Sequence, residues 1–373
     1  MAYFDYSANY PVNDEVLQEF IRVEKEARGN ANSIHQEGKE SFRLYEEANQ
    51  KVFSLLHLNP ETHEVIYTSS ATESNNTVIK GVFASYLGSG RKMLASEFEH
   101  SSTNAALSSL KDKGAEIELV KTNKDGTIDL NDLSDKLDPD TILTCLSMVE
   151  GELGARQPVE EAQRLVHERT NGFLLVDATQ AIGKFEVDLA NYDFVSFAPH
   201  KFGGIIGTGV LIKKKNIILS PLLNGGSSVS IYRSGTPAVG LIASVAKALE
   251  IAIANQEENE KRTRVLWELF FNTLGKPSNI LVNSFIDNPF VINLSIPSLK
   301  GAEIVKKLDQ NGFEVSQKSA CSIPNTPSKA VMSVYHDRHR ALSSFRISLS
   351  SLSKEEDVVS LANCIKDIAN GTK

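Results

Sequence analysis

The sequence predicts an α/β domain with a mostly parallel central sheet, joined to a smaller α+β domain that includes the C-terminal end. Short apolar runs recur between residues 65 and 212, and helix-length segments separate most of them, which is typical of parallel α/β sheets. In the last third of the chain this alternation gives way to an α+β pattern. We therefore expect a large domain over residues 15–250 and a small domain built from residues 1–14 and 251–373.

The large domain begins with a predicted helix over Ser41–Leu58, because Phe42, Tyr45, Ala48 and Val52 share one helical face. The apolar runs expected as strands are Val65–Thr68, Lys92–Ala95, Ile117–Val120, Ile142–Met148, Phe173–Val176, Phe194–Phe197 and Gly209–Ile212. A segment of helical composition from Ala238 to about Leu274 connects the two domains. The expected small-domain elements are strands at Phe290–Ile296, Phe313–Ser316 and Phe345–Leu349, and helices at Gly301–Gln310 and Lys354–Asn370.

The amino-acid composition limits the classes of protein to which this chain can belong. Apolar residues make up 41% and charged residues 23% of the 373 residues, which is ordinary for a soluble globular chain. The net charge of −8 argues against direct nucleic-acid binding. No run approaches the ~20 apolar residues of a membrane helix, and the N-terminus lacks the basic and apolar regions of a signal peptide. Three cysteines make no disulfide framework, so we expect a cytoplasmic protein without a membrane partner.

Two charged stretches have an ordinary structural interpretation. The short basic run at residues 213–215 is expected to be a solvated strand end. His336 and His339 lie in a charged stretch without other ligands at metal spacing, so a solvated loop is expected there and no metal site. Cys145 within an apolar strand and Cys364 on a helix are expected to be packing residues.

Lys201 raises a chemical question, because it follows an apolar run that is typical of a buried strand. A lysine usually keeps its charge in water. Held at the end of a buried strand, it is costly as a cation and suited to work as a neutral amine that condenses with a carbonyl. Ligands of open α/β sheets bind at the carboxyl ends of the strands, so partner groups are expected there.

Other strand ends carry matching groups. Residues 69–76 follow a strand and precede a helix-like run, where N–H groups and the helix dipole favour a phosphate, although their small and hydroxyl side chains are also ordinary helix caps. Asp177 ends a buried strand and could cap a helix or hold a protonated ring nitrogen. His100 follows another strand, where a lone histidine is more often structural. Together with Lys201 these groups describe one ligand, pyridoxal 5′-phosphate.

The same residues lie in motifs with which the chain resembles the cysteine desulfurases of the NifS/IscS type. These enzymes belong to the class V aminotransferase group of fold-type-I pyridoxal-phosphate transferases. The matching motifs are Phe-Asp-Tyr-Ser-Ala-Asn at 4–9, Gly-Asn-Ala-Asn-Ser-Ile-His-Gln-Glu-Gly at 29–38, Thr-Ser-Ser-Ala-Thr-Glu-Ser-Asn-Asn at 68–76, Glu-His-Ser-Ser at 99–102, Val-Asp-Ala-Thr-Gln at 176–180, His-Lys at 200–201, Arg-Ser-Gly-Thr at 233–236, Ser-Ala-Cys-Ser at 319–322 and Phe-Arg-Ile-Ser-Leu at 345–349. Their order and spacing cover nearly the whole chain.

The resemblance implies a role for each candidate residue. The implied cofactor ligands are Ala71 and Thr72 for the phosphate, His100 stacked on the ring, Asp177 for the ring nitrogen, Gln180 for the ring oxygen, His200 beside the lysine, and Lys201 itself. Thr236 would reach the cofactor phosphate of a neighbouring subunit, which implies a homodimer. Arg346 and Asn9 would bind the substrate, L-cysteine, with the arginine forking its carboxylate.

The implied catalytic residues are Lys201, His100 and Cys321. Cys321 lies in a stretch rich in small residues and proline, which predicts a polar loop where a thiolate can form, and the neighbouring Lys318 favours the anion. The implied reaction converts L-cysteine to L-alanine and leaves a persulfide on Cys321. A sulfur-acceptor protein would then take the sulfur for iron–sulfur cluster assembly, tRNA thiolation or cofactor synthesis.

The chain departs from the family pattern at three positions. The family usually has asparagine, serine and arginine where this chain has Gly151, Ala198 and Ser230. Each neutral hydrogen bond lost in this way costs about 1 kcal/mol. Two alternatives stay open beside a cysteine desulfurase. One is another fold-type-I enzyme such as a selenocysteine lyase or β-lyase, and the other is a catalytically impaired sulfur-transfer partner protein.

Overall fold

The computed structural model describes residues 1–318 and 326–371. Its centre is a seven-stranded sheet in the order β2-β8-β7-β6-β5-β3-β4. Neighbouring strands are parallel except where β8 pairs with β2 and β7. The strands are β2 (His63–Thr68), β3 (Lys92–Ser96), β4 (Glu116–Val120), β5 (Thr141–Ser147), β6 (Phe173–Asp177), β7 (Phe194–Phe197) and β8 (Gly209–Lys214). This mostly parallel sheet confirms the predicted α/β class.

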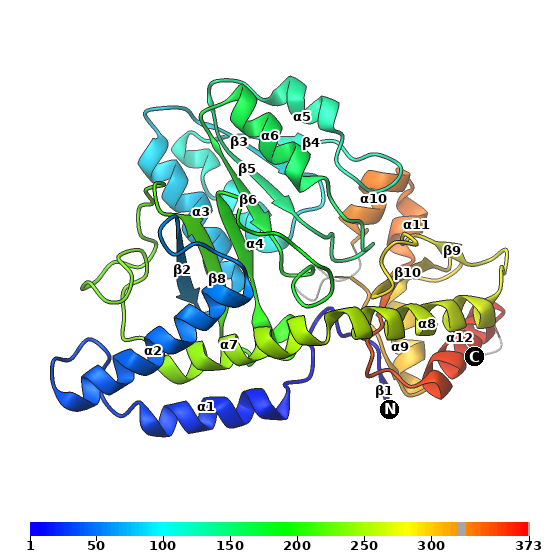
Figure 1. Ribbon diagram of the computed structural model, residues 1–373. Helices are drawn as coiled ribbons and strands as arrows, with labels where there is room; N and C mark the ends of the chain where they lie inside the picture. The colour runs from blue at the N-terminus through cyan, green and yellow to red at the C-terminus, as the bar shows by residue number, and fades with distance from the viewer. Residues whose placement is uncertain (319–325, 372–373) are drawn as a thin grey trace.

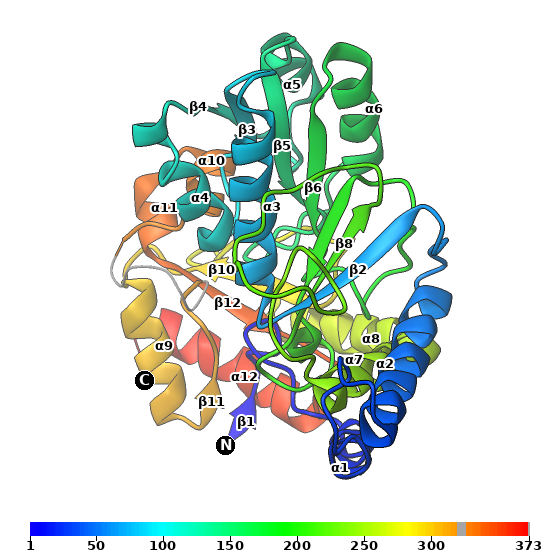
Figure 2. The ribbon, with the colours of Figure 1, turned by 90° about the vertical axis from the view of Figure 1, so that its left-hand side faces the viewer.

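Helices cover both faces of the sheet because its strands are apolar on both sides. In β6, Leu174 and Val176 pack into one core and Leu175 into the other. The helices α3 (Ala71–Tyr86) and α4 (Ser101–Ser108) cover the second of these faces (Figure 2). The first core is shared with α1 (Asp14–Glu26), α2 (Gln36–Leu55), α5 (Leu130–Lys136), α6 (Val159–Arg169) and α7 (Val239–Ala254).

The predicted connecting helix is two helices. α7 is followed by α8 (Gln256–Leu274), and the pair is bent by 60° at Asn255. α7 packs in the large core, whereas Leu266 and Phe270 of α8 belong to a separate core near the C-terminus. Among the described residues, no single helix is long and apolar enough to cross a membrane, and α7 with α8 passes that test only as a bent pair.

The separate core lies between a small sheet and its helices (Figure 1). The small sheet has the antiparallel order β12-β10-β9, with β9 (Leu281–Val282), β10 (Val291–Ser295) and β12 (Ser344–Ser348). The other elements are α9 (Gly301–Gln310), β11 (Phe313–Glu314), α10 (Lys329–Tyr335), α11 (Arg338–Leu342) and α12 (Glu355–Ala369). The N-terminal β1 (Ala2–Tyr3) pairs with β11, so both ends of the chain meet here.

Two sequence expectations were wrong in detail. Lys213 is not a solvated strand end, since its side chain is 0% exposed. Its Nζ lies 3.4 Å from a Glu64 carboxylate oxygen and 4.5 Å from the centre of the Tyr232 ring, and these contacts compensate the buried charge. Phe42 is 44% exposed, so the buried face of α2 runs through Leu44 instead. Cys145 and Cys364 are buried, as expected of packing residues.

Candidate functional site

The first turn of α3 forms an anion-binding end at the edge of the sheet. Ser70 Oγ accepts a hydrogen bond from the Glu73 N–H at 3.2 Å, and Glu73 Oε2 accepts from the Ser69 N–H at 2.7 Å. This reciprocal capping fixes where the helix begins. Within the described chain the N–H groups of Ala71 and Thr72 have no hydrogen-bond partner. The dipole and these N–H groups therefore suit a phosphate.

Asp177 ends β6 with its carboxylate held in place. Asn75 of α3 donates to Asp177 Oδ2 at 3.0 Å, and the Thr179 N–H donates to Oδ1 at 3.0 Å. Asn75 is buried and also accepts a hydrogen bond from Ser196 of β7 at 2.5 Å. The amide of Asn75 thus links α3 to Asp177, and this hydrogen bond fixes the orientation of the Asp177 carboxylate.

Lys201 lies in a short 3-10 turn, Pro199–Lys201, directly after the buried strand β7. Its Nζ donates to the carbonyl oxygen of Ala8 at 2.6 Å. Lys201 also lines a cavity of about 380 Å³ between the N-terminal segment, α7 and residues 349–352. The amine is therefore at the carboxyl end of the sheet and held by a neutral acceptor.

Two histidines flank the site, and the surroundings of each favour its neutral imidazole. His100 caps α4, and its Nδ1 accepts a hydrogen bond from the Ser102 N–H at 3.2 Å, which leaves the ring proton on Nε2. Burial lowers the pKa of His100, and the nearby Asp177 opposes that effect. Burial and the charge of Lys201 lower the pKa of His200 to about 4.

The N-terminal segment Asp5–Asn9, called the strap here, crosses the sheet edge and contacts several candidates. Gln180 Nε2 donates to the carbonyl oxygen of Ser7 at 3.0 Å. Arg346 forms an ion pair with Asp5 at 2.8 Å and donates to the carbonyl oxygen of Gly151 at 2.9 Å. Together with the Lys201 contact, these bonds bring three candidate residues from distant parts of the chain to one strap.

Several buried polar atoms at the strap have no hydrogen-bond partner within the described chain. They are Ser7 Oγ, Asn9 Oδ1, Thr179 Oγ1 and Arg346 Nε. Leaving a polar atom buried and unpaired costs about 1–3 kcal/mol, so such a cluster is typical of a site that a polar ligand completes. Asn9 and Arg346 are the two residues expected at the substrate.

Other candidates lie elsewhere. Thr236 is exposed, and the Asn30 side chain donates to its hydroxyl at 3.4 Å. Cys321 lies outside the described residues. Gly151 leaves room, because a Cβ built there would lie 3.6 Å from Gln180 Cγ. Ser230 donates to Glu64 at 3.0 Å, a contact that anchors the loop before Thr236 to β2.

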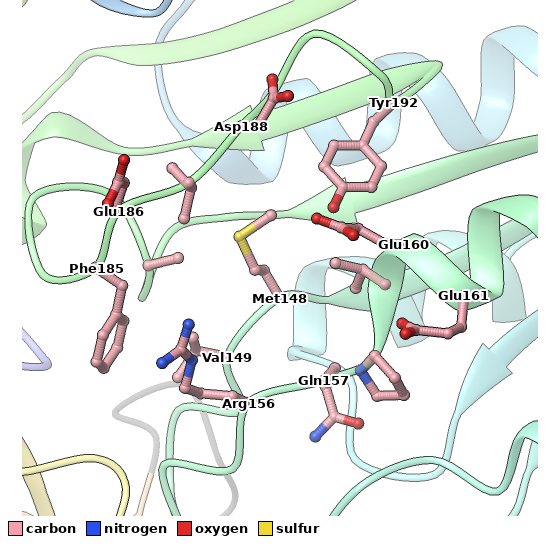
Figure 3. A pocket seen from close by; sticks show the side chains of 14 residues that line it. Met148, Val149, Arg156, Gln157, Glu160, Glu161, Phe185, Glu186, Asp188 and Tyr192 are labelled. Atoms are coloured by element: carbon pink, nitrogen blue, oxygen red, sulfur yellow. The ribbon is translucent and has the colours of Figure 1, made fainter.

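A second hollow, of about 180 Å³, lies beside the start of α6 (Figure 3). Glu160 and Tyr192 stand on one side of it, and Arg156 and Phe185 on the other (Figure 3). The guanidinium carbon of Arg156 lies 4.7 Å from the centre of the Phe185 ring. None of the residues that line this hollow is a sequence-predicted site residue.

Sequence reasoning missed the residues that hold the site together. Asn75 lies in the motif at residues 68–76, but nothing in the neighbouring sequence indicates that its amide reaches Asp177. Glu99, beside His100, is 5% exposed and accepts from Ser96 and from both the N–H and the hydroxyl of Ser147. It thereby joins the ends of β3 and β5. The available signal was a glutamate three residues beyond the end of an apolar strand.

Comparison with known proteins places this geometry in a family context. The model of the aminotransferase class-V family matches residues 2–361. A cysteine desulfurase IscS of Dictyoglomus turgidum is 32% identical, over 95% of this chain and 91% of the relative. A solved structure described as a NifS-like protein has a TM-score of 0.90 and 30% identity, with 100% of both chains covered. Another, SspA in complex with cysteine, has a TM-score of 0.80 and 26% identity, over 95% of this chain and 100% of SspA.

Proposed function

Because the chain belongs to the aminotransferase class-V family, and within it resembles the NifS/IscS cysteine desulfurases over its whole length, we propose that it is a pyridoxal-phosphate-dependent cysteine desulfurase. It converts L-cysteine to L-alanine and passes the sulfur to an acceptor protein. One observation carries the proposal most directly. An amine, a fixed carboxylate and the unpaired N-terminus of a helix meet at the carboxyl edge of one sheet.

The donor set fits pyridoxal phosphate. The unpaired N–H groups of Ala71 and Thr72 suit its phosphate, and the fixed carboxylate of Asp177 suits a protonated ring nitrogen. The orphaned Thr179 Oγ1 adds an unpaired polar atom beside that carboxylate. When bound, the cofactor supplies an aldehyde that condenses with amines and a ring that withdraws electrons from the substrate.

Each protein group has a separate task. Lys201 Nζ would hold the cofactor through its aldehyde carbon, and its amine would accept the proton that leaves the substrate Cα. His100 would stack on the ring of the bound cofactor, and its imidazole, whose pKa burial lowers, would give or take a proton at Nε2. Gln180 would donate to the ring oxygen of the cofactor, and His200 would contact its phosphate beside the helix. The strap fixes Lys201 and Gln180 through the Ala8 and Ser7 carbonyl oxygens before the substrate arrives.

Substrate binding and sulfur transfer require a cationic anchor and a nucleophile. Arg346 binds the substrate carboxylate, with its unpaired Nε available, and Asn9 Oδ1 accepts from the substrate. The Cys321 thiolate then attacks the substrate sulfur. An S–S bond forms, the substrate Cβ–S bond breaks, and its electron pair takes a proton at Cβ. The thiol and cysteine thus become a persulfide and alanine, with atoms and charge balanced.

The proposed assembly is a homodimer in which Thr236, exposed in one chain, reaches the cofactor phosphate of the other. The sulfur acceptor is an iron–sulfur scaffold protein or a tRNA-thiolation enzyme. The substitutions at Gly151 and Ser230 then concern rate rather than identity of the reaction, since Ser230 is engaged with Glu64 and Gly151 still supplies its carbonyl oxygen to Arg346.

Cofactor loading and alanine formation test the proposal together. The protein is incubated with pyridoxal phosphate, its visible absorbance is recorded, and alanine is measured after addition of L-cysteine and a reductant. Lys201→Ala should lose both the lysine-bound absorbance and the alanine. Lys215→Ala, which removes an exposed lysine just beyond β8, should lose neither. Alanine formation by Lys201→Ala at the wild-type rate would contradict the proposal.

A further inference from the structure

A second lysine is buried beside the site, and the proposed reaction does not use it. Lys184 lies in the turn that follows β6, is 7% exposed, and lines the same cavity as Lys201. Among the described residues no carboxylate forms an ion pair with it. Burial lowers the pKa of Lys184 to about 7, and the charges of Lys201 and Arg346 act in the same direction. Such a residue is costly to keep in place of an apolar one.

The contact that Lys184 makes explains its position. Its Nζ donates to Gln180 Oε1 at 2.6 Å, while Gln180 Nε2 donates to the Ser7 carbonyl oxygen at 3.0 Å. The two residues are four apart in the chain, and the turn between them, with Gly183 at a φ of 76°, brings their side chains together. The Ser7 carbonyl oxygen only accepts, so it requires the N–H edge of the Gln180 amide, and in that orientation Oε1 accepts the hydrogen bond that Lys184 donates.

The remaining hydrogen of Gln180 Nε2 is left for a ligand. Within the described chain, Nε2 has the Ser7 oxygen as its only acceptor. The space next to Nε2 is open on the side of Gly151, where a Cβ built on the glycine would lie 3.7 Å away. An amide flipped by 180° would instead present its oxygen to that space and repel an anionic oxygen.

We propose that Lys184 is a positioning residue that locks the Gln180 amide with its N–H edge toward the bound ligand, so that the site selects a ring carrying a phenolic or phenolate oxygen. This inference deepens the proposed function and rests on it. Lys184 touches neither substrate nor cofactor and acts only through Gln180. The alternative is a purely structural role, in which its stem packs near the Phe290 ring, 6.0 Å from Nζ.

A double-mutant cycle on the full-length protein separates the two roles. The variants are Lys184→Met, Gln180→Leu and the double variant, and the probe is pyridoxal phosphate. The readouts are its dissociation constant and the absorbance maximum of the bound form. Loss of the locked hydrogen bond should weaken cofactor binding on the order of tenfold in Lys184→Met. In the Gln180→Leu background the same substitution should add no further loss and no spectral shift.

Gln180→Glu provides a second variant if Lys184→Met does not fold. It keeps an acceptor for Lys184 and removes the N–H donor, so it should weaken cofactor binding as strongly as Gln180→Leu. The proposal is overturned if Gln180→Glu binds like the wild type, or if Lys184→Met has the same effect in both backgrounds. A wild-type protein that binds no pyridoxal phosphate would instead overturn the proposed function on which this inference depends.

Discussion

Glu99 provides a quantitative prediction about the coupling between buried charge and stability. The substitution Glu99→Gln keeps the shape of the side chain and its bonds to Ser96 and Ser147, because the amide oxygen accepts and the amide N–H can donate to the Ser147 hydroxyl. Burial raises the pKa of Glu99 from 4.5 to about 7, with the serine hydrogen bonds opposing the rise and Asp177 adding to it. The folded protein therefore binds this proton more tightly than the unfolded chain.

The sign and size of the effect follow from linkage. The stabilisation by the protonated Glu99 is fully present below pH 4.5 and is lost as the pH rises through about 7. One pKa unit corresponds to about 1.4 kcal/mol, so the loss is about 3 kcal/mol. The free energy of unfolding of the wild type should thus fall by about 3 kcal/mol relative to Glu99→Gln between pH 4.5 and pH 8.

Urea unfolding of both cofactor-free proteins at several pH values measures this difference. Glu116→Gln is the matched control, since it removes a carboxylate from an exposed position on β4. A wild-type minus Glu99→Gln difference that does not change with pH would refute the reasoning, because it would mean that the buried carboxyl binds its proton no more tightly than in the unfolded chain.

Four further substitutions test the site and its supports. Asp5→Asn removes the charged partner of Arg346, so it should lower the free energy of unfolding by about 1–3 kcal/mol and also lower KM for L-cysteine, and an unchanged KM would argue against a carboxylate at this arginine. Asn75→Ala leaves the aspartate at the end of β6 without its amide donor, and should cost about 1–3 kcal/mol in urea unfolding and weaken cofactor binding. Cys145→Ala and Cys364→Ala should each cost about 1 kcal/mol of stability and leave alanine formation intact, and loss of activity with normal folding would show that one of them takes part in sulfur transfer.

The strands could be predicted from the sequence because both faces of the sheet are covered, which makes each strand a continuous apolar run. Lys213 shows where local pattern fails. Three consecutive lysines indicate solvent, but β8 lies inside the sheet, and the partner Glu64 is 149 residues away in the chain. The strap shows the same limit. Its hydrogen bonds to Lys201 and Arg346 span 193 and 341 residues, and no periodicity encodes them.

The candidate residues themselves could be found because chemistry restricts their types. A lysine, an aspartate and a helix start at successive strand ends satisfy one ligand, whatever the rest of the fold does. The groups that orient them, such as Asn75 and Lys184, use ordinary amide and ammonium contacts that occur throughout proteins. The role of each such group depends on the residue that it contacts, and only the folded structure identifies that residue.

The most direct test of the account is a single turnover on the wild-type protein loaded with pyridoxal phosphate, with one equivalent of L-cysteine and no reductant. Alanine and the mass of the peptide containing Cys321 are measured from the same sample. The account predicts alanine in step with the gain of one sulfur atom on Cys321, and neither in Cys321→Ala. Equal alanine from the wild type and Cys321→Ala would contradict it and would favour elimination chemistry without a protein nucleophile.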